Sequence, residues 1–387
     1  MRMIVFLMTL PLFLSCSGSV SEQEPEEPAL VPVKVNVNPL PEYSVSNLDF
    51  AMMCGGVAHT QGKRLWAFWT AGGDSGKAFT VLMHSDDDGA SWSDVDVVLD
   101  AHEPGRECKT MGGCLWTDPE GRLWAFYGQS MSYFDGRSGT WYIRCDNPDS
   151  DRPVWSDPKR IWHGSATNTP IVLRDGKWLL PVTLGDGGGR FPDLDRFRGA
   201  DVLISTDRGK TWEYSGGVRF PHPDYNEHCI VELSDGRVWM TARTSEGIWQ
   251  SFSSDEGRTW TMPSKCLNHN RSRHLIMKLE SGHLMLVKHG APDENPEKRV
   301  RLTAYVSEDE GKTWNGGLVL DERKNAAYPY GCQAADGTIY IVYDRNRDNY
   351  GEILMARITE KSIKENSQRP EDGLRLIVTK VGKKQQK

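Results

Sequence analysis

The sequence lacks the patterns that mark fibrous and coiled-coil proteins. Its 38 glycines follow no fixed period, and no apolar heptad survives them and the 21 prolines, which excludes collagen and coiled coils. Basic residues are not in excess either, since 46 lysines and arginines face 53 acidic residues. Nucleic acid is therefore not an expected partner. Disorder is also excluded, because 14 tryptophans, 12 tyrosines and 11 phenylalanines need burial.

Cysteines with metal-ligand spacing are missing as well. No CxxC motif occurs, and the chain beyond Cys16 holds seven cysteines, which is an odd number. No His/Glu pair shows ligand spacing, so we predict no metal site. Cys108 and Cys114 could pair in an oxidising compartment, but the default expectation is mostly buried, reduced thiols.

Only one apolar run stands out, and it lies at the N-terminus. It extends from Ile4 to Leu14 behind a basic Met-Arg-Met start, which is typical of an export signal and too short to span a bilayer. The segment 12–16 resembles a bacterial lipobox, in which Cys16 would be lipidated. We expect a signal peptide over 1–15, a lipidated cysteine and tether over 16–40, and a protein lipid-anchored to the cell envelope, on the periplasmic or surface side of the outer membrane. The alternative is an ordinary cleaved signal.

An eight-residue motif, Ser-x-Asp-x-Gly-x-Thr/Ser-Trp, occurs four times. Its Ser and Asp side chains can bind nearby backbone N–H groups, its Gly permits positive φ, and its Trp can pack the turn against a sheet. The motif therefore predicts a tight hairpin with a structural role. A decayed copy is expected near Trp155. The four copies begin at Ser85, Ser205, Ser253 and Ser307.

A second repeat sets the number of units. A glycine-led turn followed by an apolar strand recurs six times, at intervals of 46 to 60 residues. Six such units predict an all-β fold, a six-bladed β-propeller of four-stranded antiparallel blades over 41–360. The tail 361–387 would then hold a closing strand at Leu374–Val381, unless Val33–Val37 has that role. The six glycines are Gly62, Gly121, Gly176, Gly236, Gly282 and Gly337.

Propellers bind ligands around the central channel, where inner strands end and loops follow. The ends of the six repeated strands are therefore candidate site positions. Polar groups recur there in register, which favours a functional role over ordinary surface polarity. These ends are Thr70–Asp74, Gly128–Ser130, Leu184–Asp186, Arg243–Thr244, Lys288–His289 and Asp344–Arg345.

One segment carries a more specific resemblance. Residues 226–237 read NEHCIVELSDGR and continue to Arg243, so a Glu precedes an apolar strand, a DGR turn and an Arg. Together with the Asp-box motifs, this resembles the bacterial sialidase (neuraminidase) superfamily over about residues 45–358. The resemblance implies that Glu227 is the partner of a nucleophile. It also implies that Arg243 is one of three arginines that grip a substrate carboxylate.

A second match supplies further roles. Arg299 lies eight residues before Ser307, and Tyr328 lies 14 residues after Trp314. The resemblance implies that Arg299 is another of the three arginines, with Arg301 as the alternative, and that Tyr328 is the nucleophile. A carboxylate such as Glu227 can serve as base for a tyrosine, and sialidases are the tyrosine exception among glycosidases. Asp74 resembles the acid/base of the family.

The chain departs from the family at one place. The segment that opens the first blade, 50–57, reads FAMMCGGV and has no arginine. Another cation would have to substitute for it. The histidines near the channel are candidates for proton transfer. The candidate cations are Arg106, Arg190, Arg273 and Lys288, and the candidate histidines are His228, His274 and His289.

These observations predict an exo-acting, sialidase-type glycoside hydrolase that removes a terminal acidic sugar from a glycan, needs no cofactor, and acts as a monomer. One alternative is a polysaccharide lyase on uronate-containing glycans, favoured if His228 or His289 rather than Asp74 faces the substrate carbon. The other is a non-catalytic glycan-binding propeller, which would show aromatic platforms without a paired Tyr and Glu.

Overall fold

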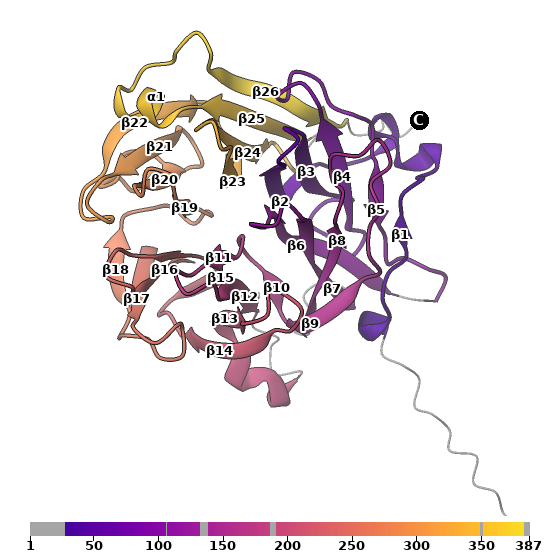
Figure 1. The fold of residues 1–387 in the computed structure, drawn as a ribbon, viewed down its shortest axis with the longest axis horizontal. Helices are drawn as coiled ribbons and strands as arrows, with labels where there is room; N and C mark the ends of the chain where they lie inside the picture. The colour runs from indigo at the N-terminus through magenta and orange to yellow at the C-terminus, as the bar shows by residue number, and fades with distance from the viewer. Residues whose placement is uncertain (1–27, 106, 132–137, 186–190, 349–350, 383–387) are drawn as a thin grey trace, which may run out of the picture.

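The computed structural model describes residues 28–105, 107–131, 138–185, 191–348 and 351–382. Within these ranges six antiparallel sheets surround a common axis, as Figure 1 shows. The predicted all-β, six-bladed propeller is confirmed. The predicted signal peptide and Cys16 lie outside the described residues.

The first three blades follow one another in chain order, each from its inner to its outer strand. Blade one holds β2 (Met52–His59), β3 (Leu65–Ala71), β4 (Phe79–Ser85) and β5 (Val97–Leu99), with β1 (Val35–Asn36) added outside β5. Blade two holds β6 (Cys108–Thr117), β7 (Leu123–Met131), β8 (Ser138–Cys145) and β9 (Lys159–His163). Blade three holds β10 (Ser165–Ala166) and β11 (Ile171–Val172), which both pair with β12 (Trp178–Leu184), then β13 (Gly199–Ser205) and β14 (Glu213–Val218).

The last three blades repeat the plan without added strands. Blade four holds β15 (Pro223–Glu232), β16 (Val238–Thr244), β17 (Gly247–Ser253) and β18 (Ser264–Leu267). Blade five holds β19 (Leu275–Lys278), β20 (Leu284–His289), β21 (Leu302–Ser307) and β22 (Asn315–Asp321). Blade six holds β23 (Ala326–Gln333), β24 (Ile339–Arg345), β25 (Glu352–Ile358) and β26 (Gly373–Lys380). The helices are η1 (Pro28–Leu30), η2 (Pro41–Tyr43), η3 (Val45–Asn47), η4 (Pro192–Phe197) and α1 (Glu360–Lys364).

The glycine-led repeat forms the second strand of every blade. These strands are almost completely buried, since each faces a neighbouring blade on both sides. Trp66, Trp124, Trp178 and Trp239 lie on four of them and are at most 2% exposed. Burial of such large apolar side chains between blades is the main favourable term in the fold.

The Asp-box motifs form the turns between the third and fourth strands of blades one, three, four and five. In the first copy, the Ser85 hydroxyl donates to the Asp87 carboxylate at 2.8 Å, and the Ser91 N–H and hydroxyl donate to the same carboxylate at 2.8 and 2.6 Å. Gly89 has φ 81° and donates its N–H to Ser85 Oγ at 2.9 Å. The other three copies repeat these bonds, so the predicted structural role is supported.

Blade two carries the decayed copy where it was expected. Asn147 replaces the aspartate, and its Oδ1 accepts hydrogen bonds from Val154 N at 2.8 Å and Cys145 Sγ at 3.4 Å. Trp155 pairs with Cys145 through an isolated bridge. The turn thus keeps a side-chain acceptor at the position of the box carboxylate.

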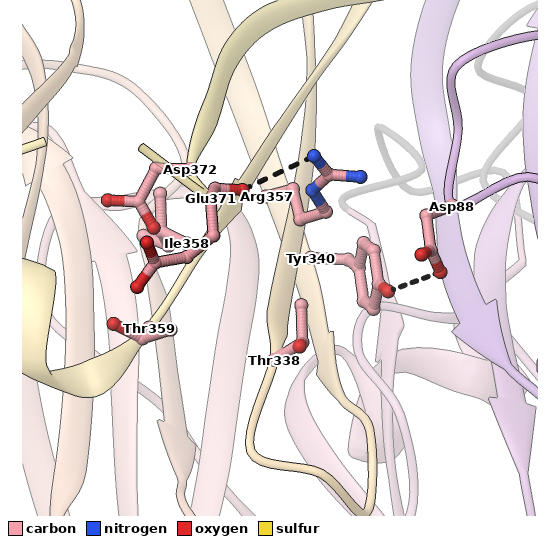
Figure 2. A pocket seen from close by; sticks show the side chains of 8 residues that line it. All are labelled: Asp88, Thr338, Tyr340, Arg357, Ile358, Thr359, Glu371 and Asp372. Carbon is pink, nitrogen blue, oxygen red and sulfur yellow. Dashed lines mark hydrogen bonds between the residues drawn. The ribbon is translucent and has the colours of Figure 1, made fainter. Parts of the chain in front are cut away.

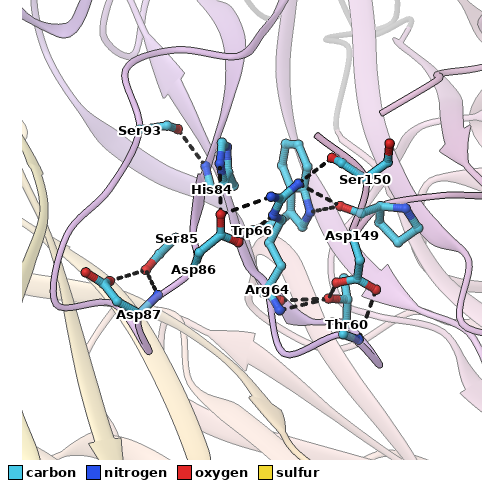
Figure 3. A network of polar contacts seen from close by, with 12 residues as sticks. Thr60, Arg64, Trp66, His84, Ser85, Asp86, Asp87, Ser93, Asp149 and Ser150 are labelled. Atoms are coloured by element: carbon cyan, nitrogen blue, oxygen red, sulfur yellow. Dashed lines mark hydrogen bonds and ion pairs between the residues drawn. The ribbon is translucent and has the colours of Figure 1, made fainter. Parts of the chain in front are cut away.

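Charged groups connect neighbouring blades one and two, as Figure 3 shows. Arg64 forms a two-point ion pair with Asp86 at 2.7 and 3.0 Å and donates to the Ser150 carbonyl at 2.7 Å. The carboxylate of Asp149 accepts from Thr60 and from the N–H of residue 62. These bonds fix the angle between the two blades.

Both candidate closing strands exist, at the outer edges of different blades. The C-terminal segment forms β26 and completes blade six, whereas β1 pairs with β5 in blade one. Neither strand crosses between blades six and one. That junction instead depends on side chains, since Asp344 Oδ2 accepts from Met53 N at 2.8 Å and Tyr340 OH donates to Asp88 Oδ1 at 3.1 Å.

Described cysteines are free thiols, so the alternative of a Cys108–Cys114 disulfide is wrong. Both residues lie on β6 and are at most 1% exposed. Burial raises the pKa of the Cys114 thiol, as expected of an unreactive structural cysteine.

We predict that Asp255→Ala in the blade-four box lowers the free energy of unfolding by about 1 kcal/mol at pH 7, because it removes three hydrogen-bond acceptor contacts at an exposed turn. Hydrogen bonds from Thr259 lower the pKa of Asp255 to about 2. The wild-type advantage should therefore shrink as pH falls from about 4 to 2, where the folded-state carboxylate takes up its proton. Urea unfolding at several pH values measures this.

Asp151→Ala is the control. The substitution removes the same negative charge from an exposed position in the corresponding loop of blade two. Its effect should stay within about 0.5 kcal/mol. Equal effects of the two substitutions would contradict a stabilising role for the box.

Candidate functional site

The candidate site lies where inner strands begin and second strands end, on one face of the ring. Four inner strands, β2, β6, β15 and β23, carry bulges there, and two of these bulges hold predicted site residues. The register of β15 shifts between Pro223 and His228, and that of β23 shifts between Ala327 and Tyr330. Bulges redirect side chains and occur beside active sites. These two bulges contain Glu227 and Tyr328, the predicted base and nucleophile.

The backbone at these bulges is strained. Tyr328 has φ 59°, and Tyr225 and Asn226 have φ 65° and 50°. Non-glycine residues in this region cost about 1–3 kcal/mol each and persist only where the surrounding structure holds them. Such outliers concentrate at functional sites, which supports this location.

Arg243, at the end of β16, connects the predicted residues. Its guanidinium donates to Glu227 Oε2 at 2.8 Å and to Tyr328 OH at 3.3 Å. It also forms an ion pair with Asp224, with Nε 2.9 Å from Oδ2. Arg243 is 4% exposed, so these bonds compensate the burial of its charge.

Glu227 is poised as an anionic hydrogen-bond acceptor. Burial alone would raise its pKa, but the charges of Arg243 and Arg273, with hydrogen bonds from Arg243 and Tyr328, hold the pKa below its usual value. The carboxylate is thus ionised at neutral pH and bonded to the Tyr328 hydroxyl. A proton on that hydroxyl has an acceptor within reach.

Two further guanidinium groups lie over the Tyr328 ring. The Cζ atom of Arg299 is 5.6 Å from the ring centroid, and that of Arg347 is 3.8 Å from it. Burial and then the charge of Arg347 lower the pKa of Arg299. Among the described residues no carboxylate lies within ion-pair distance of Arg299, whose Nη2 donates to the Arg271 carbonyl at 3.3 Å.

Arg301, the alternative to Arg299, lies elsewhere. It forms an ion pair with Glu294, and its side chain is 48% exposed. The structure therefore places Arg299, and not Arg301, at Tyr328.

Four residues of this cluster were not singled out for it by the sequence. Asp224 is 5% exposed and bridges Arg243 to Arg271, whose Nη2 lies 3.1 Å from Asp224 Oδ1. Asp344 pairs with Arg347 at 2.6 Å. Asp344 was visible only as the polar end of the sixth repeated strand, with Arg347 three residues further on.

Three predicted substrate-binding residues are bonded to backbone carbonyls, and no hydrogen bond or ion pair joins them to Tyr328 among the described residues. His228 places Nε2 2.9 Å from the Asp201 carbonyl and Nδ1 2.8 Å from the Asn226 carbonyl. Lys288 donates to the carbonyls of His289 at 2.7 Å and of Glu294 at 3.3 Å. His289 Nε2 lies 2.7 Å from the Ala326 carbonyl. These side chains join neighbouring backbone segments in the interior.

Of the remaining predicted site residues, some lie near the Tyr328 cluster and others do not. Asp74 is exposed in the loop between β3 and β4, and no hydrogen bond or ion pair joins it to Tyr328 or Glu227 among the described residues. The Arg273 guanidinium lies 3.9 Å from the Tyr330 ring centroid, and its charge acts on Glu227. His274 is buried, with Nε2 2.9 Å from Thr241 Oγ1. Arg106 and Arg190 lie outside the described residues.

A cleft of about 340 Å³ adjoins the cluster and shares Arg299 and Arg271 with it. Loop residues of blades four and five line the rest, including Ser245, Asn270 and Pro296. A second cavity, of about 290 Å³, lies between Thr338, Tyr340 and Asp372 and is shown in Figure 2. Thr338 precedes β24 whereas Asp344 is near its end, so this second cavity is at the opposite end of the blade.

No group of three or more His, Cys, Asp or Glu side chains suited to a metal ion occurs in the described part of the chain. Nor does any helix there have the length and apolar character to cross a membrane.

The fold and its four Asp-box turns define a sialidase-like propeller of BNR repeats. The sequence matches the BNR repeat-like domain over residues 63–341, and the chain belongs to that family. Its structure superposes on the Hadza microbial sialidase Hz136 with a TM-score of 0.65 and 19% identity, covering 83% of this chain and 69% of that one. The Trypanosoma rangeli sialidase bound to sialic acid gives a TM-score of 0.61 at 14% identity, covering 81% and 55%.

Sequence relatives include two kinds of glycosidase. A sialidase of Paraclostridium sordellii is 25% identical over 148 residues, which are 38% of this chain and 35% of that protein. The xyloglucanase Xgh74A of Acetivibrio thermocellus is 27% identical over 166 residues, 37% of this chain and 19% of that protein. The chain thus spans less than half the length of these relatives.

Buried histidines should make the fold sensitive to acid. Burial lowers the pKa of His228 and His289 to about 4 and that of His274 to about 3. An unfolded histidine titrates near 6.5, so unfolding takes up protons between about pH 6.5 and 4, and stability falls as pH drops through this range. We predict that His289→Gln reduces the slope of unfolding free energy against pH by about 1.4 kcal/mol per pH unit.

Urea unfolding of wild type and variant at pH 4 to 7 measures the slope, which is independent of the variant's absolute stability. Gln368→Ala, which removes no titratable group, is the control and should leave the slope unchanged. An unchanged slope for His289→Gln would mean that His289 protonates freely in the folded protein, as a proton-transfer residue would.

Proposed function

We propose that the protein is an exo-acting glycoside hydrolase of sialidase type that removes a terminal acidic sugar from glycans. The observation that carries the proposal is the hydrogen-bonded set of Tyr328 and Glu227, on two strained bulges, with Arg243 at the end of β16. The sialidase relatives support the reaction class. The xyloglucanase relatives match only 37% of this chain at 27% identity, so the acidic substrate is argued from the site itself.

The charge of the site supports an anionic substrate. Arg299 is half-buried, lies near Arg347, and has no described carboxylate within ion-pair distance. Concentrating guanidinium groups without matching carboxylates is costly unless a ligand supplies negative charge. A sugar carboxylate fits this need, because a planar guanidinium binds it through two hydrogen bonds.

In the proposed reaction, the Tyr328 hydroxyl gives its proton to Glu227 as its oxygen attacks the anomeric carbon. Asp74 protonates the departing glycosidic oxygen, which leaves a sugar covalently bound to Tyr328. Water then attacks the same carbon and gives a proton to Asp74. The Tyr328 oxygen leaves with the proton that Glu227 had taken, and the enzyme is restored.

Neither alternative is favoured by a specific observation. The lyase depended on His228 or His289 facing the substrate, and both are held by backbone carbonyls. A binding-only propeller predicted no paired tyrosine and glutamate, whereas Tyr328 and Glu227 are hydrogen-bonded. The N-terminal sequence supports action at the cell envelope, with Cys16 as the lipid attachment point.

The test is hydrolysis of an aryl sialoside, beside a panel of uronate- and rhamnose-containing oligosaccharides. We predict that wild type releases the acidic sugar and that Tyr328→Phe loses at least about 10³-fold in kcat, since the nucleophile is removed. Glu227→Gln should lose about 10²- to 10⁴-fold, the range expected for a general base.

Tyr142→Phe is the control, since its phenol is buried in blade two, and it should keep wild-type activity. Full activity of Tyr328→Phe would overturn the mechanism. New ultraviolet absorbance in the product would indicate an unsaturated sugar and hence a lyase.

A further inference from the structure

The first-blade strand that lacks an arginine is connected to a charged pair in blade six. Asp344 is completely buried at the end of β24, and its Oδ2 accepts the N–H of Met53 in β2 at 2.8 Å. Burial raises the pKa of this carboxyl, whereas the charge of Arg347 acts to lower it. A buried carboxyl at this junction needs a cation, and blade six supplies one.

Arg347 is that cation, and its orientation is fixed. Its Nε lies 3.2 Å from Asp344 Oδ1 and its Nη2 lies 2.6 Å from Asp344 Oδ2, which is a two-point pair. Its side chain is only 12% exposed. Such a pair sets the plane of the guanidinium, and the Tyr328 ring is then 3.8 Å from Cζ.

The charges around Tyr328 do not balance. Among the described residues, three carboxylates, those of Asp224, Glu227 and Asp344, pair with guanidinium groups of the cluster, and a fourth, that of Glu297, lines the adjoining cleft. Five guanidinium groups accompany them, on Arg243, Arg271, Arg273, Arg299 and Arg347. A positive excess at one half-buried point of a chain whose net charge is −7 favours an anionic ligand there.

We propose that Arg347 replaces the missing first-blade arginine and acts, with Arg243 and Arg299, as a specificity-determining residue for the substrate carboxylate. This inference rests on the proposed function, since it requires an acidic sugar at Tyr328. Asp344 is then a positioning residue, which holds Arg347 over the tyrosine ring. A purely structural role for Arg347, neutralising Asp344 at the junction of blades six and one, is the competing explanation.

The experiment compares binding of two probes by calorimetry. One is the 2,3-unsaturated sialic acid analogue, and the other is its methyl ester, which lacks the negative charge. Arg347→Gln should weaken binding of the acid about 10- to 100-fold, the loss expected for a charged hydrogen-bonded pair, and leave binding of the ester unchanged.

Arg375→Gln is the matched control. It removes the same charge from the outer strand of blade six, where Arg375 pairs with Glu322 at 2.8 Å, and it should change neither affinity. Arg347→Lys keeps a cation beside Asp344 and covers the case in which the glutamine variant fails to fold. Because lysine cannot bind a carboxylate in two-point fashion, it should still lose about tenfold for the acid.

The outcomes are separable. Wild type that binds neither this acid nor any free uronate would overturn the proposed function, and this inference with it. Wild type that prefers the acid, with Arg347→Gln and Arg347→Lys binding it within twofold of wild type, would overturn the role of Arg347 alone. Equal losses for acid and ester would also overturn it, because they would show a structural effect.

Discussion

The buried guanidinium of Arg243 is the interaction on which the site depends. It contacts Asp224, Glu227 and Tyr328, and so joins the inner strand of blade four to that of blade six. A buried cation with 4% exposure needs such partners, and their loss would leave it uncompensated. The same bonds keep Glu227 ionised beside the tyrosine. The bonds that neutralise the buried charge of Arg243 are therefore the same bonds that hold Glu227 ready to accept the proton of Tyr328.

The rigid propeller explains how this arrangement can include strained backbone. Bulges in β15 and β23 place Tyr225, Asn226 and Tyr328 at positive φ. Flanking residues pair in register with fully buried second strands, and Asp-box turns secure the outer ends of four blades. Because the inner strands are held at both sides of each bulge, the unfavourable conformation persists.

Much of this was accessible from sequence, for a definite reason. The resemblance to sialidases identified Glu227, Arg243, Arg299 and Tyr328, because the first two flank a recognisable hairpin and the last two lie at fixed distances from an Asp box. Arg347 and Arg271 lie in loops whose course no local pattern specifies. Lys288 and His289 were placed at the site because they end a repeated strand. Residues of a buried strand point alternately to its two faces, however, and both of these faces are covered by neighbouring backbone.

Every blade is built from strands that are consecutive in the chain, so no strand is shared between the first blade and the last. The circle is completed by side-chain bonds such as those of Asp344 with Met53 and of Tyr340 with Asp88. Arg347 forms its ion pair with Asp344, the residue that makes the first of these bonds. Opening the circle at that seam would therefore release the arginine that overlies Tyr328. An anion held by Arg243, Arg299 and Arg347 would bridge blades four, five and six, and through Arg347 and Asp344 its binding would be coupled to the junction of blades six and one.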